Sequence, residues 1–104
     1  MKQIIDRKLY NTETAEELYR WSNGAYATDF KWRAKTLYRT AKGALFVHHE
    51  GGAMTDCARR VGNNTMTGGE YLEPVTAEDA VAFLASHDGA EVVLEHFAEH
   101  VDEA

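Results

Sequence analysis

The sequence predicts an α+β domain: a small antiparallel sheet with a central hairpin, flanked by an N-terminal helix and two C-terminal helices. Two β-rich runs with alternating polarity cluster between positions 32 and 50, in the middle of the chain. Helix-start signals precede apolar stretches of helical spacing near both ends. The chain has 104 residues, of which 44% are hydrophobic, so it fits a single domain over positions 1–104.

The first third of the chain predicts a short strand followed by a helix. Residues 2–10 are apolar at intervals and fit a strand. Thr14 and Glu17 match the capping box S/T-x-x-E, in which each residue satisfies a free backbone amide at a helix start. We therefore expect a helix over 14–22, ended by Asn23 or Gly24, with one apolar face made of Ala15, Leu18, Tyr19 and Trp21.

The middle of the chain predicts a hairpin. Residues 32–40 and 44–49 form the two strands, and Gly43 suits the left-handed position of the connecting loop. Side chains alternate between the two faces of a strand, so one face of the first strand is expected to be basic. That face carries Arg33, Lys35, Leu37 and Arg39, and the opposite face carries Trp32, Ala34, Thr36 and Tyr38.

Glycine pairs make residues 50–70 a loop-rich segment, with a short helix expected over 55–60. Residues 71–75 predict a strand at the edge of the sheet. Pro74 has no backbone N–H and cannot donate the hydrogen bond that a strand with neighbours on both sides needs. Thr76 and Asp79 then open a helix that Asp88 and Gly89 break. A last helix is expected over 90–101, with core residues Val93, Leu94, Phe97 and Val101.

The net charge of −6 hides a strong asymmetry along the chain. All eleven basic residues lie at or before position 60, whereas ten of the seventeen acidic residues lie after it. Such asymmetry indicates an interaction surface, unless the basic N-terminal part neutralises the acidic C-terminal part inside the molecule or the charge simply keeps the protein soluble. Our candidate partner-binding residues are the acids of the last helix and its flanks: Asp88, Glu91, Glu95, Glu99, Asp102 and Glu103.

The sequence gives weaker signals for metal binding, enzymatic catalysis and nucleic-acid binding. His96 and His100 have the i, i+4 spacing of a metal-ligand pair, but the H-E-x-x-H form is missing. A metal- or cysteine-dependent enzyme would have to use His48, His49, Glu50 and Cys57, with no known signature around them. No phosphate-binding loop is present. The acidic isoelectric point near 5.3 disfavours direct nucleic-acid binding. We expect no catalytic residue, metal or cofactor.

The sequence also indicates a cytoplasmic protein that does not bind membranes. No apolar run approaches the roughly 18–20 residues that span a bilayer, and charge returns at Asp6 before any secretory segment. The single cysteine, Cys57, cannot form an internal disulfide, as is usual in a reducing compartment. The oligomeric state stays open, and an alternative function is a general interaction module without an acidic-surface role, for example a dimer joined through the edge of the hairpin.

Several motifs resemble a family of small bacterial proteins that recur in Gram-positive genomes, phages and mobile elements. The resemblance spans roughly positions 8–85 and rests on KLYNTETA at 8–15, WSNG at 21–24, DF at 29–30, TLYRTAKG at 36–43 and EGGA at 50–53. It implies no established activity. In size and charge the chain is also similar to anti-CRISPR inhibitors, which commonly cover the basic nucleic-acid channel of a Cas effector. The leading hypothesis is therefore a non-enzymatic inhibitor that binds a basic protein surface through the acidic residues.

Overall fold

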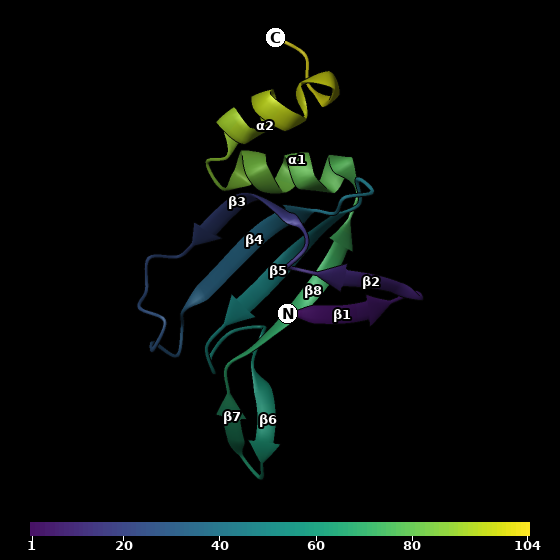
Figure 1. The fold of residues 1–104 in the computed structure, drawn as a ribbon. Helices are drawn as coiled ribbons and strands as arrows, with labels where there is room; N and C mark the ends of the chain where they lie inside the picture. Colours follow the sequence, from purple (N-terminus) through teal and green to yellow (C-terminus); the bar gives the residue numbers. More distant parts are fainter.

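The computed structural model describes all residues, 1–104, and contains three antiparallel sheets and two α-helices (Figure 1). The largest sheet has four strands in the order β3-β4-β5-β8. Two separate hairpins, β1-β2 and β6-β7, extend from it. The elements are β1 (Lys2–Ile5), β2 (Lys8–Asn11), β3 (Glu16–Ser22), β4 (Arg33–Arg39), β5 (Leu45–Gly51), β6 (Arg59–Gly62), β7 (Thr65–Thr67), β8 (Gly69–Val75), α1 (Ala77–Ser86), α2 (Ala90–His96) and the 3-10 turn η1 (Ala98–His100).

The α+β class is confirmed, but the predicted N-terminal helix is wrong. Residues 16–22 form the edge strand β3, which pairs with β4 along its whole length. In this strand Tyr19 and Trp21 point to the same side and contact α1 and its C-terminal cap: Tyr19 packs edge-on against Phe83, and Trp21 against His87. Long-range pairing and packing therefore outweigh the local capping signal at Thr14. Both α-helices lie at the C-terminal end of the chain.

The strands predicted over 32–40 and 44–49 are confirmed as the antiparallel pair β4 and β5. The predicted alternation along β4 also holds, because Arg33, Lys35, Leu37 and Arg39 share one face. That face lies under the helices, so it is not a free basic patch. The core on this side is formed by buried apolar residues of the sheet and both helices: Leu37, Leu45, Val47, Ala80, Leu84, Val93 and Phe97.

The hairpin β1-β2 covers part of the opposite face of the sheet. Its tight turn uses Asp6 and Arg7, both with positive φ, as in the mirror-image turns that hairpins favour. Tyr10 from this hairpin packs with Phe46 and Leu72 of the sheet in a second apolar cluster. The segment predicted as a strand over 2–10 is thus a complete hairpin.

Both edges of the large sheet are closed to further strands. On β8, Pro74 has no backbone N–H, and the N–H of Leu72 donates to the side-chain oxygen of Gln3 in β1 (3.0 Å). The predicted edge position of residues 71–75 is confirmed. On β3, a bulge between Glu17 and Tyr19 interrupts the ladder. Bulges and prolines are common devices that block edge-to-edge association.

The two helices differ in how closely they follow the sequence pattern. Helix α1 begins with the predicted capping box, in which Thr76 and Asp79 exchange hydrogen bonds. Helix α2 ends at His96 instead of continuing to 101, and a 3-10 turn follows. Val93 and Phe97 are buried as expected, but Leu94 and Val101 are exposed, so their assignment to the core is wrong. Neither helix has the length and apolar character needed to cross a bilayer.

Residues 52–68 form turns and the hairpin β6-β7; the short helix predicted over 55–60 does not form. Glycines allow backbones to touch at this end of the molecule. A Cβ on Gly52 would lie 2.5 Å from the carbonyl oxygen of Asp29, and one on Gly68 would lie 2.7 Å from that of Gly51. The glycine pairs thus serve close chain crossings, in agreement with the absence of a phosphate-loop pattern.

Candidate functional site

The six acidic candidates lie at one end of the molecule, around α2 and the C-terminus (Figure 1). All six are exposed. Only Glu91 and Glu95 lie on α2; Glu99 is in η1, and Asp102 and Glu103 follow in the non-helical tail. The expectation that Glu99 lies on a last helix over 90–101 is therefore wrong, because α2 ends at His96. We refer to Asp88, Glu91, Glu95, Glu99, Asp102 and Glu103 as the C-terminal acidic surface.

No lysine or arginine forms an ion pair with the C-terminal acidic surface. The arginines of the sheet pair elsewhere: Arg20 with Glu50, Arg33 with Asp56 and Arg39 with Glu16. The surface's own contacts are with neighbouring histidines, Glu95 with His96 (3.7 Å) and Glu99 with His100 (3.4 Å). The basic hairpin therefore does not neutralise these carboxylates by direct pairing.

The proposed metal pair is separated by the end of α2. His96 is the last residue of α2, and its Nδ1 lies 3.4 Å from Nη2 of Arg39. His100 lies in η1 beside Glu99. A cation next to His96 opposes the binding of a second positive charge. Nowhere in the chain are three or more His, Cys, Asp or Glu side chains grouped so that they could hold a metal ion.

The residues considered for an enzyme are divided between the two faces of the sheet. His48, His49 and Glu50 are consecutive in β5, so His48 and Glu50 point away from the helices and His49 points toward them. On the outer face, His48 contacts Glu70 (2.8 Å), and Arg20 contacts Glu50 (3.3 Å). His48, His49, Glu50 and Cys57 therefore do not converge on one reaction centre.

Cys57 is buried, and burial raises the pKa of its thiol. Its sulfur approaches a carboxylate, Oδ1 of Asp56, at 3.9 Å. A nearby base or cation that favours the thiolate is what activates a catalytic cysteine. Arg33 is such a cation and lowers the pKa of Cys57, but the effect of burial is larger, so the pKa of the thiol stays raised and the protonated form is favoured.

A polar network around the buried His49, on the helix-side face, was not predicted from the sequence. Arg33 holds Asp56 through two hydrogen bonds (2.7 and 3.1 Å) and donates from Nη2 to Nδ1 of His49 (2.7 Å). Because arginine is always a donor, Nδ1 must accept and Nε2 carries the proton, which it donates to Glu73 (2.8 Å). Tyr71 stacks on His49 and donates to Asp56. Arg33 and His49 share a face because of the register between β4 and β5, and alternation along both strands combined with that register is the signal that could have pointed to their proximity.

The electrostatic environment of this network favours the neutral form of His49. His49 is only 7% exposed, and burial, with the charges of Arg33 and Lys35, lowers its pKa below the usual 6.5 despite the hydrogen bond to Glu73. The hydrogen bond from Arg33 lowers the pKa of Asp56. The groups are mutually satisfied, and no buried side-chain polar atom in the chain lacks a partner. Such a network is typical of a structural element that fixes one packing arrangement.

Two open clefts lie on the surface of the molecule. One, of about 400 Å³, lies between the sheet and α1 and is bordered by Lys35, His49, Glu73 and His87. The other, of about 420 Å³, lies at the opposite end from the C-terminus, between the loop that joins β3 to β4 and the glycine pairs. Phe30, Trp32 and Met66 supply its apolar wall.

Comparison with known proteins finds no matching family model, curated protein or solved structure. The resemblance of the sequence motifs to the phage and mobile-element family stays a prediction.

Proposed function

We propose that this protein is a non-enzymatic inhibitor from a phage or mobile element that binds a basic surface of another protein in the cytoplasm of a bacterial host. The observation that supports the proposal is the C-terminal acidic surface, whose six exposed carboxylates have no lysine or arginine partner within the chain. Like charges four residues apart on a helix are destabilising by about 0.2–0.5 kcal/mol per pair. A basic partner removes that repulsion on binding.

The nucleic-acid channel of a Cas effector is our proposed target, which would make the protein an anti-CRISPR inhibitor. Such a channel is a basic surface that normally holds a phosphate backbone. The acidic residues occupy one end of a molecule with dimensions of 51 × 32 × 19 Å, so that end can approach a groove while the sheet stays outside. Steering by opposite charge would make association fast and sensitive to salt.

Charge reversal tests the proposal. The variant Glu91→Lys, Glu95→Lys, Glu99→Lys changes only exposed side chains, so its circular dichroism spectrum should match that of the wild type. The matched control reverses three exposed acids outside this surface: Glu13→Lys, Glu17→Lys, Glu78→Lys.

The first experiment compares proteins captured by wild type, variant and control from a bacterium that carries CRISPR-Cas. The second measures affinity for the purified effector and inhibition of its target cleavage. We expect the variant to lose more than about tenfold in affinity while the control binds nearly as well as wild type. Inhibition that survives in the variant would show that the acidic surface is not the binding site.

A further inference from the structure

The cleft at the end of the molecule opposite the C-terminus is lined by aromatic and acidic side chains. Phe30 and Trp32, from the loop that joins β3 to β4, line it together with Met66 of β7. Every charged residue that lines this hollow of about 420 Å³ is acidic. We define the loop-end cleft by its glycine-rich floor and these six side chains: Phe30, Trp32, Met66, Asp29, Glu50 and Glu70.

Backbone contacts fix the shape of the loop-end cleft. The N–H of Met54 donates to the carbonyl of Phe30 (2.8 Å), and the N–H of Gly52 donates to that of Trp32 (2.9 Å). A Cβ on Gly52 would lie 2.6 Å from the carbonyl oxygen of Phe30, and one on Gly68 would lie 2.7 Å from that of Gly51. The loop that carries the two aromatic residues is therefore held against the end of the sheet, and the cleft is formed before a ligand binds. Such preorganisation lowers the entropic cost of binding.

Two of the acids repel each other across the sheet. Glu50 of β5 and Glu70 of β8 are directly opposite in the strand register, and like charges at such positions are destabilising. Arg20 and His48 contact only the Oε1 atoms of the two carboxylates, and neither residue lines the cleft. The Oε2 atoms of Glu50 and Glu70 accept no hydrogen bond within the chain. A positively charged ligand in the cleft would therefore reduce an existing repulsion.

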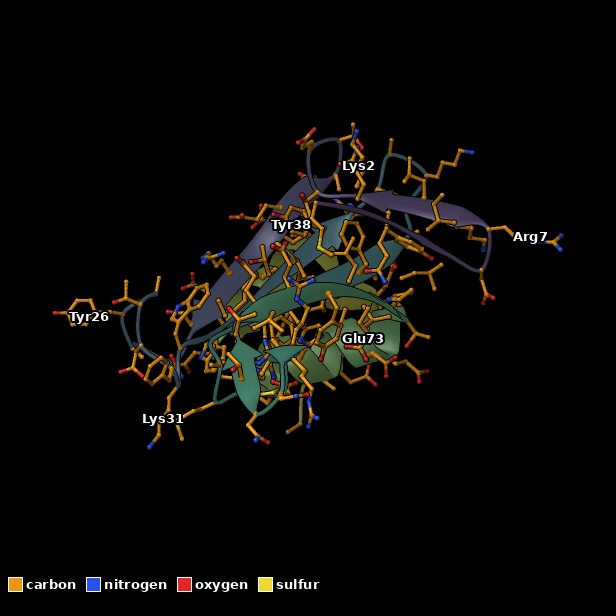
Figure 2. The ribbon with its side chains drawn as sticks, turned by 90° about the horizontal axis from the view of Figure 1, so that it is seen from below. Lys2, Arg7, Tyr26, Lys31, Tyr38 and Glu73 are labelled. Carbon is orange, nitrogen blue, oxygen red and sulfur yellow. The ribbon has the colours of Figure 1, made fainter.

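The loop-end cleft contains no lysine or arginine that could neutralise its acids. Lys31 is the only basic residue of the loop between β3 and β4. Its backbone N–H donates to Oδ1 of Asp29 (2.7 Å), but its side chain is directed away from the sheet (Figure 2). Arg59 borders a separate hollow, which it shares with Glu70, but the two side chains form no ion pair. Phe30 is 66% exposed, so the cleft offers accessible aromatic surface beside its negative charge.

This combination is suited to an organic cation. The faces of aromatic rings attract cations, and carboxylates accept hydrogen bonds from charged N–H groups. The acids are not grouped so that they could hold a metal ion. A guanidinium is planar and weakly hydrated, so it can stack on an aromatic ring while its edge donates to carboxylates, whereas an ammonium is compact and strongly hydrated. The volume of the cleft is near the lower end of the usual range for ligand pockets, roughly 300–1,000 Å³, as a single long side chain requires.

We propose that the loop-end cleft binds an arginine side chain of another polypeptide. The guanidinium packs against the aromatic wall of Phe30 and Trp32 and donates to the free oxygens of Glu50 and Glu70. Free arginine fits less well, because its α-carboxylate would meet only acidic residues in the cleft. The loop-end cleft shares no residue with the C-terminal acidic surface and lies at the other end of a molecule 51 Å long, so this inference is independent of the proposed function.

Nuclear magnetic resonance titration of the ¹⁵N-labelled protein tests the proposal. The probe is arginine capped as its Nα-acetyl N-methylamide, which carries one positive charge and imitates a residue within a polypeptide. Three matched probes accompany it. Capped citrulline has nearly the same shape but a neutral urea, capped lysine has an ammonium, and free L-arginine has an uncapped carboxylate.

Capped arginine should saturate with a Kd between about 0.1 and about 3 mM at about 20 mM salt. The amide signals that shift should be those of the cleft, in residues 29–32, 50–53 and 67–70. Capped citrulline should bind at least about tenfold more weakly, because it lacks the charge. Capped lysine and free L-arginine should each bind at least about threefold more weakly than capped arginine.

Variants separate the two parts of the cleft. Asp29→Asn with Glu70→Gln removes two charges at exposed positions and should weaken the binding of capped arginine at least about tenfold. Phe30→Ser, also at an exposed position, should weaken it at least about threefold. The matched control, Glu13→Gln with Glu17→Gln, removes two exposed acids outside the cleft and should bind as wild type does. The spectra of the unliganded proteins verify that each variant is folded.

Four results would overturn the proposal. The first is no saturable binding of capped arginine up to about 10 mM. The second is equally tight binding of capped citrulline, and the third is unchanged affinity in the Asp29→Asn, Glu70→Gln variant. The fourth is equally tight binding of free L-arginine, which would identify the ligand as the free amino acid. The variant Glu91→Lys, Glu95→Lys, Glu99→Lys separates this proposal from the proposed function. It should still bind capped arginine at the loop-end cleft even though it loses the basic protein partner.

Discussion

Replacing Arg33 by methionine should lower the free energy of unfolding by about 3 kcal/mol. The guanidinium of Arg33 donates to Nδ1 of His49 and to the carbonyl of Ala34 (2.8 Å), and both residues are buried. A buried acceptor that loses its donor costs about 1–3 kcal/mol, so these two groups account for about 2–6 kcal/mol. The ion pair with Asp56 adds little, about 0–1 kcal/mol, because the Asp56 side chain is 61% exposed and is solvated again.

Arg39→Met is the matched control. Arg39 lies on the same strand and face, but it has one ion pair, with the exposed Glu16, and a long contact with His96. Its replacement should cost about 0–1 kcal/mol. Urea denaturation followed by far-ultraviolet circular dichroism measures both variants without depending on Trp32, the neighbour of Arg33. If Arg33→Met and Arg39→Met differ by less than about 0.5 kcal/mol, the network around His49 does not stabilise the fold as argued.

Three further outcomes follow from the structure. The free energy of unfolding should fall in two stages as the pH is lowered. The first stage begins below pH 6.5, because the pKa of His49 is lowered in the folded state and the unfolded chain therefore binds a proton at this histidine first. The second stage begins below about 3.8, the ordinary pKa of Asp56, because folding lowers the pKa of this carboxyl as well. Urea midpoints from pH 8 to 3 measure this, and His49→Gln should remove only the first stage. Cys57 should react slowly with a thiol reagent in the native state and rapidly in urea, because burial shields it and raises its pKa; equal rates would refute this. Gly52→Ala should cost more than about 2 kcal/mol in a thermal melt, whereas Gly62→Ala, whose Cβ would meet nothing closer than 3.9 Å, should stay within about 1 kcal/mol of wild type.

The parts of the fold that could be predicted are those whose local and tertiary preferences agree. Helix α1 has both a capping box at Thr76 and an apolar face, and strands β4 and β5 have both alternation and a glycine-containing turn. At residues 14–22 the two preferences conflict. The local pattern favours a helix, but pairing with β4 and the contacts of Tyr19 and Trp21 with the α1 end of the molecule favour a strand.

The candidate functional site could likewise be predicted only in part. The acidic residues could be identified from charge alone, because no basic residue follows position 60. The end of α2 at His96 could not be predicted, and it places Glu99 outside the expected last helix. The network around His49 joins residues from three strands and a turn, so it depends on strand register, which no single segment specifies.

The contact between Gln3 and Leu72 gives the first eleven residues a protective role. If proteolysis or a downstream start of translation removed β1 and β2, the backbone donor of Leu72 would be free and the second apolar cluster would lose Tyr10. Pro74 would then be the only device left that blocks pairing along β8, beside newly exposed Phe46, and an open strand edge next to apolar surface favours edge-to-edge association. The N-terminal hairpin thus protects the sheet against aggregation. Forms of the chain that lack β1 and β2 should precipitate under conditions in which the full chain stays in solution.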